Sequence, residues 1–155
     1  MNAGITDLVT RLAALPNELG DLIDGRDDHE LRRAAAGGGW GPVEVFCHLR
    51  DLDALFVERI ERILREDEPF FQEVDETLWP IERDYASQDP RRALDEFAAN
   101  RARYVALLDG LTAEQLDRRA HHEVRGDETI LWYVLHSVEH DAVHRQQLVA
   151  ALGEP

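Results

Sequence analysis

Hydrophobic residues recur at helical spacing along most of the chain, and the alternation typical of strands is scarce. Spacings of three and four residues place apolar side chains on one face of a helix. This pattern predicts four long helices, over residues 4–23, 42–66, 91–109 and 129–152. It also predicts a short helix over 112–117, because Thr112 and Gln115 have the spacing of a capping box.

Proline and glycine mark the expected ends of these helices. Pro42 suits the first position of the second helix, where no backbone N–H is needed, and Gly110 and Gly153 suit positions just past a helix end. Pro16 lies inside the first helix and predicts a kink or a break there. Residues 24–39 end in three glycines and are expected to form a polar loop.

Four long helices predict an all-α fold, an antiparallel four-helix bundle that forms a single domain over residues 1–155. The connection between the second and third helices, residues 67–89, is long and rich in aromatic residues. Connections of this length are often functional or contain a short element of their own. Two interpretations follow: a loop that covers core left open by the helices, or a lid over a pocket.

Charge and composition narrow the classes of partner. The chain has 155 residues and a net charge of −15, and its 17 basic residues are all arginine. Such a charge argues against nucleic acid and against anionic membranes as partners, since both need a basic surface. No apolar stretch is long enough to span a membrane, no signal peptide is seen, and the single Cys47 excludes an internal disulfide. A cytoplasmic protein is therefore expected.

Histidines form the most suggestive pattern in the sequence. His136, His140 and His144 follow one another at intervals of four residues on the predicted fourth helix, which places neighbours on one face. At about 100° per residue, His140 and His144 lie on the flank of the apolar stripe, whereas His136 lies farther off and is expected to face solvent or a partner. His48 lies on the corresponding flank of the second helix.

Three imidazoles, those of His48, His140 and His144, could therefore converge between two helices and bind one divalent metal with a vacant position. Solvated histidines on an amphipathic helix would show the same spacing. Cys47 points away from the stripe and is expected to be a small half-buried residue. Possible hydrogen-bonding supports for the ligands or for a bound water are Gln147, Asp51 and Asp141. For the two carboxylates, a solvated or salt-bridged surface position is the alternative.

Other side chains allow more than one interpretation. Arg101, on the third helix, is expected to form an exposed salt bridge or to meet a substrate carboxylate. Trp40, Trp79 and Phe71 suit either a dimer face or the core. The zincin motif H-E-x-x-H, the P-loop and the G-x-S-x-G nucleophile motif are all missing from the sequence.

Three segments, in this order, make the chain similar to a known family: W-G-P-V-E-V-F-C-H-L-R-D at 40–51, R-R-A-H-H-E-V-R-G at 118–126 and H-S-V-E-H-D-A-V-H-R-Q-Q-L at 136–148. They resemble the DinB-like (DinB/YfiT) family of metal-binding four-helix bundles. The resemblance implies a divalent metal, zinc or nickel before iron or manganese, bound by His48, His140 and His144. It also implies a homodimer.

The resemblance implies several activities at one site. The first is transfer of a low-molecular-weight thiol, of the bacillithiol or mycothiol type, to a small-molecule electrophile. The second is hydrolysis of a small substrate by metal-activated water. The third alternative is a non-catalytic, stress-related bundle that binds metal without turnover. All three require the same three histidines, so the sequence separates them poorly.

Overall fold

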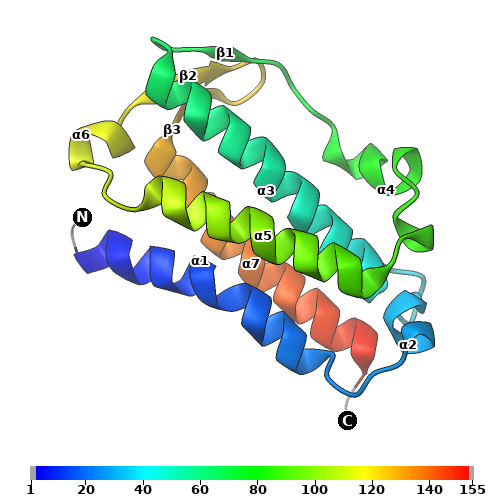
Figure 1. The fold of residues 1–155 in the computed structure, drawn as a ribbon. Helices are drawn as coiled ribbons and strands as arrows, with labels where there is room; N and C mark the ends of the chain where they lie inside the picture. Colours follow the sequence, from blue (N-terminus) through cyan, green and yellow to red (C-terminus); the bar gives the residue numbers. More distant parts are fainter. Residues whose placement is uncertain (1–2, 154–155) are drawn as a thin grey trace.

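Four long helices dominate the computed structural model, which describes residues 3–153 (Figure 1). The mostly helical fold is confirmed, and each predicted long helix ends within one residue of the observed one. The four helices are α1 (Ala3–Leu22), α3 (Pro42–Arg65), α5 (Pro90–Leu108) and α7 (Ile130–Leu152). The first helix continues through Pro16 without a break.

The direction of the helices differs from the simple antiparallel bundle that the sequence predicts. α3 and α5 run in the same direction, as do α1 and α7, and the two pairs are antiparallel to each other (Figure 1). α3 packs more extensively against α5 than against any other element. The reason is the connection after α3, which leads the chain back to the end where α3 begins before α5 starts (Figure 1).

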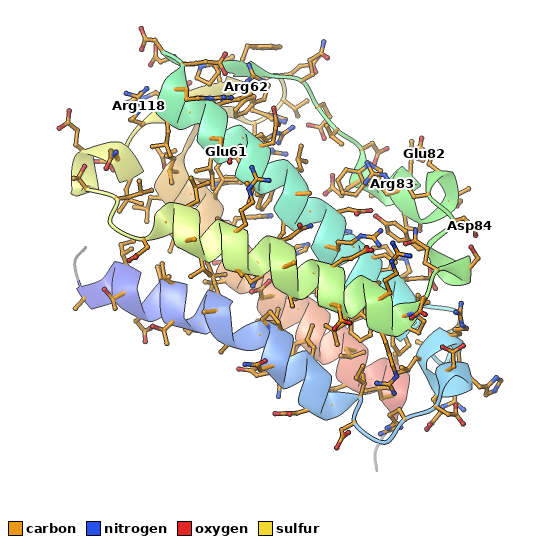
Figure 2. The ribbon with its side chains drawn as sticks, in the orientation of Figure 1. Glu61, Arg62, Glu82, Arg83, Asp84 and Arg118 are labelled. Atoms are coloured by element: carbon orange, nitrogen blue, oxygen red, sulfur yellow. The ribbon has the colours of Figure 1, made fainter. Side chains whose placement is uncertain are left out.

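Side chains tie this returning segment to α3. It contains β1 (Phe70–Phe71), the 3₁₀ turns η1 (Glu76–Leu78) and η2 (Tyr85–Ser87), and the short helix α4 (Trp79–Glu82). The Tyr85 hydroxyl donates a 2.6 Å hydrogen bond to Asp51 of α3, and Arg83 (labelled in Figure 2) forms a 3.0 Å ion pair with the same carboxylate. Trp79 and Tyr85 are buried. These contacts favour the interpretation of the segment as a cover for the core.

A small sheet lies at one end of the bundle and is not predicted from the sequence. β2 (Arg119–His122) pairs in parallel with β1 and antiparallel with β3 (Gly126–Thr129). Strands this short give too few alternating positions to be recognised. Arg118, labelled in Figure 2, donates to the carbonyl oxygens of Ile63 and Glu66 and so joins the sheet to the end of α3.

Capping boxes begin two short helices, of which the sequence analysis predicts one. α6 (Ala113–Leu116) is the predicted short helix, with the expected reciprocal hydrogen bonds between Thr112 and Gln115. The predicted loop at 24–39 instead contains α2 (Asp28–Arg32), whose first turn is capped by the same type of bonds between Asp27 and Glu30.

One continuous apolar core joins the long helices, α2 and the returning segment. It also encloses charged side chains, including Arg101, Asp53 and Asp141. None of the helices in the described part of the chain is long and apolar enough to cross a lipid bilayer.

Gly41 immediately precedes α3, and a Cβ at this position would collide with the backbone carbonyl oxygen of Arg33. Overpacking of this type costs about 1–3 kcal/mol. Gly41→Ala should therefore lower the free energy of unfolding in urea by about that amount. Gly20→Ala is the matched control, because Gly20 lies in α1 with open space around it and should gain about 0.5–1 kcal/mol. Equal effects of the two substitutions would contradict this account of α3's start.

Candidate metal centre

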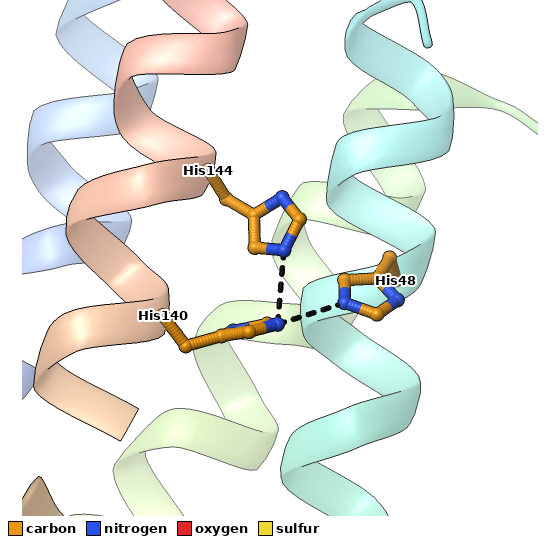
Figure 3. Close-up of side chains that lie close together, drawn as sticks. All are labelled: His48, His140 and His144. Atoms are coloured by element: carbon orange, nitrogen blue, oxygen red, sulfur yellow. Dashed lines mark hydrogen bonds between the residues drawn. The ribbon is translucent and has the colours of Figure 1, made fainter. Parts of the chain in front are cut away.

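Three histidines from two helices meet at the centre of the candidate site (Figure 3). His48 lies in the second turn of α3, and His140 and His144 lie on successive turns of α7. The Nε2 atom of His140 is 3.0 Å from Nε2 of His48 and 2.9 Å from Nε2 of His144. The structure thus brings together the three histidines selected from the sequence, and each offers one ligand atom to a common point.

Protons alone cannot satisfy these three nitrogens. Nδ1 of His144 lies 2.7 Å from Oε1 of Gln147, which only accepts, so Nδ1 carries the proton and Nε2 keeps a lone pair. One proton on Nε2 of His140 can be directed well at only one of its two neighbours. A cation would accept all three lone pairs, and nitrogens around a tetrahedral zinc ion lie about 3.3 Å apart. The donor set therefore fits a divalent cation after a small spreading of the rings.

Burial keeps the three imidazoles neutral, the form that binds metal. Burial, and then the neighbouring His144, lower the pKa of His48 to about 3. Burial also lowers the pKa of His140, to about 2, with further contributions from His144 and His48. The pKa of His144 is lowered by burial as well, although its hydrogen bond to Gln147 opposes this.

Trp40 packs against two of the three rings. Its ring is nearly parallel to that of His144, with an interplanar angle of 10° and centroids 5.9 Å apart, and its centroid is 5.0 Å from that of His48. The start of α3 at Pro42 holds this tryptophan beside the site. Trp40 therefore covers part of the rings of His48 and His144.

His136 does not face solvent as the sequence predicts. It is half-buried and stacks on Trp132 at 4.8 Å and on His140 at 5.8 Å between ring centroids. Phe56 of α3 approaches the same ring at 5.9 Å. On the helical wheel, His136 lies away from the apolar stripe of α7. Aromatic side chains of α3 and α7, Phe56 and Trp132, nevertheless cover it.

The supporting residues expected from the sequence divide into two groups. Gln147 contacts His144 directly, as described above. Asp51 instead anchors the returning segment, and Asp141 accepts hydrogen bonds from Arg101. Both carboxylates thus follow the salt-bridged alternative, although in partly or fully buried surroundings rather than on an open surface. Nδ1 of His48 is buried and has no hydrogen-bond partner among the described residues.

Cys47 is excluded as a ligand by its surroundings. It is fully buried rather than half-buried, and its sulfur lies 3.6 Å from Oε1 of Gln88. Burial raises the pKa of the Cys47 thiol to about 11. The chain therefore offers no thiolate of its own to this site.

Arg101 lies in the core, not on the surface as the sequence predicts. The expected exposed salt bridge is wrong, because the Arg101 side chain is 2% exposed and paired with Asp53 and Asp141. A signal was available: Arg101 falls between Phe97 and Tyr104 on the apolar stripe of its helix. Charged residues on such a stripe require buried partners of opposite charge.

Two bacterial proteins are similar to this chain over most of its length. Bacillus subtilis YfiT is 28% identical over 147 residues, covering 92% of this chain and 82% of its own length. A protein of Oceanobacillus iheyensis is 23% identical over 149 residues, covering 96% and 86%. Both carry the name “Putative metal-dependent hydrolase”.

The structure of YfiT shares the fold. It superposes with a TM-score of 0.75 at 24% identity, covers 96% of this chain and 90% of YfiT, and is described as an unusual four-helix bundle topology. The model of the DinB superfamily matches residues 11–148. This match spans most of the sequence, and the chain therefore belongs to the DinB superfamily.

Proposed function

We propose that this chain is a metal-dependent enzyme that acts on small molecules at His48, His140 and His144. The observation that carries the proposal is the close approach of three Nε2 atoms, 2.9 and 3.0 Å apart, that protons cannot satisfy together. The names of the bacterial relatives, which describe metal-dependent hydrolases, support the same conclusion.

A site of three histidines leaves room for a substrate atom. The cluster contains no fourth histidine, cysteine or carboxylate ligand among the described residues. Catalytic zinc sites typically have three protein ligands and an open position, whereas structural sites have four. Zinc and nickel both suit imidazole ligands, as does iron, while manganese prefers oxygen. When bound, such a metal supplies Lewis acidity that lowers the pKa of a thiol or of water.

The reaction we propose first is the transfer of a low-molecular-weight thiol. Asp51 and Asp141 are both engaged in ion pairs, so neither is free to act as a base at the histidine cluster. A thiol, with a pKa near 8.5, needs far less help to ionise than water does. Because Cys47 is buried, the thiol must come from a substrate. Its sulfur forms a bond to carbon of an electrophile, the leaving group departs, and the thiol proton passes to solvent.

Hydrolysis is the second candidate, and the names of the relatives favour it. In that case water replaces the thiol as the nucleophile, and an ester or amide bond is the substrate. The role of the chain's residues is the same in both reactions. His48, His140 and His144 would hold the metal, Gln147 orients His144 through Nδ1, and Trp40 packs against the rings of His48 and His144.

An assay of the metal-loaded protein separates these candidates. Protein loaded with zinc or nickel is incubated with a panel of thiols and electrophiles, and separately with esters and amides without thiol. We expect a thiol-dependent product, and we expect His48→Ala and His144→Ala to lose turnover and to weaken metal binding by more than about 100-fold. His121→Ala is the matched control, because His121 is exposed on β2 and pairs with Asp127.

Each other outcome of this assay has a definite meaning. Cleavage of esters or amides without thiol would replace the transferase by a hydrolase. Metal binding without turnover on any substrate would favour a binding protein. If the wild-type protein, purified without a histidine tag, contained no metal and bound none, the whole proposal would be wrong.

Proton release on metal binding tests the neutral state of the three histidines. At about pH 6, three imidazoles of ordinary pKa would release roughly two protons when metal displaces them. Here the lowered pKa values of His48, His140 and His144 mean that the protons are already absent, so we expect release of less than about one. Calorimetry in two buffers of different ionisation enthalpy measures the number of protons released. The same titration at about pH 8 gives the baseline. Release of about two protons would contradict the account.

A further inference from the structure

Arg101 lies at the centre of the bundle, and every N–H of its guanidinium group has a partner. It donates two hydrogen bonds to Asp53, at 2.7 and 3.1 Å, and two to Asp141, at 2.6 and 3.0 Å. The fifth goes to the carbonyl oxygen of Leu12, at 3.0 Å. A guanidinium has five such donors in a fixed planar fork, so this one is saturated.

The two carboxylates belong to the two helices that carry the metal-site histidines. Asp53 lies five residues after His48 on α3, and Asp141 immediately follows His140 on α7. Arg101 comes from α5, which contributes no histidine to the cluster. One planar group therefore spans α3 and α7 and also holds α1 through Leu12.

We infer that Arg101 is a positioning residue for the metal site: by bridging Asp53 and Asp141 it fixes how α3 and α7 lie relative to each other, so that the histidines meet. The inference rests on the proposed function. α3 packs less extensively against α7 than against α5, so direct packing between the two histidine-bearing helices is limited. A rigid tie through α5 supplies the missing constraint.

Stability alone explains this arrangement poorly. Burying ions costs free energy that their mutual attraction often only offsets, and apolar residues of similar size are frequently as stable. Two carboxylates against one guanidinium also leave a surplus of negative charge in the core.

Arg101→Lys separates geometry from charge, since lysine keeps the positive charge and loses the planar fork. We expect the folded variant to bind Zn²⁺ about 10–100-fold more weakly than the wild type, the loss typical of removing a group that orients metal ligands. Competition with a chromophoric chelator measures the affinity, at a temperature where circular dichroism shows the variant folded. The visible absorption of Co²⁺-loaded protein should also shift, because it reports ligand geometry.

Two further variants make the result decisive. Asp53→Asn removes one side of the bridge with little change of shape and should also weaken Zn²⁺ binding and shift the Co²⁺ spectrum. Asp53→Asn decides the question alone if Arg101→Lys does not fold. Leu116→Ala is the control, because Leu116 is buried in α6 at the opposite end of the bundle. It should lower the unfolding temperature and leave affinity and spectrum unchanged.

The possible failures are distinguishable. If the wild type binds Zn²⁺ and a folded bridge variant retains its affinity and Co²⁺ spectrum, Arg101 is only structural and this inference is wrong. An equal loss of affinity in Leu116→Ala would overturn it too, since general destabilisation would then suffice. If the wild type binds no metal, the proposed function fails, and the inference fails with it.

Discussion

The candidate metal site depends on one local constraint: the Nε2 atoms of two buried histidines and one half-buried histidine, 2.9 and 3.0 Å apart, compete for too few protons. Burial removes the option of charging the rings, because it lowers the pKa of His48 and His140 far below their ordinary values. A shared cation relieves the competition without placing a charged imidazole in the core. Gln147 and Trp40 contact the cluster and help to hold its rings in place.

The unusual direction of the helices also affects how the histidine-bearing helices are held together. Because the returning segment brings the chain back along α3, α5 runs parallel to α3 and places Arg101 between the two histidine-bearing helices (Figure 1). Asp51, three residues after His48, anchors the returning segment through Tyr85. The two aspartates thus make different contacts: Asp51 binds the returning segment, and Asp53 faces the core.

Much of this could be predicted from the sequence, for physical reasons. Long amphipathic helices and capping residues are local signals, and the helical wheel selected His48, His140 and His144 because they flank apolar stripes. Helix direction, the burial of Arg101 and the covering of His136 depend on partners distant in the sequence, which local patterns do not encode. The thiol substrate and the homodimer stay predictions.

X-ray absorption spectroscopy of the zinc-loaded protein, without added thiol, identifies the atoms that bind the metal. We expect a zinc ion with imidazole nitrogens at about 2.0–2.1 Å and no sulfur neighbour. The predicted scattering pattern of three imidazole rings should be lost in His140→Ala. A sulfur shell near 2.3 Å would place zinc on Cys47, and a spectrum of oxygen ligands alone would place it among surface carboxylates. Either result would contradict a metal centre formed by His48, His140 and His144.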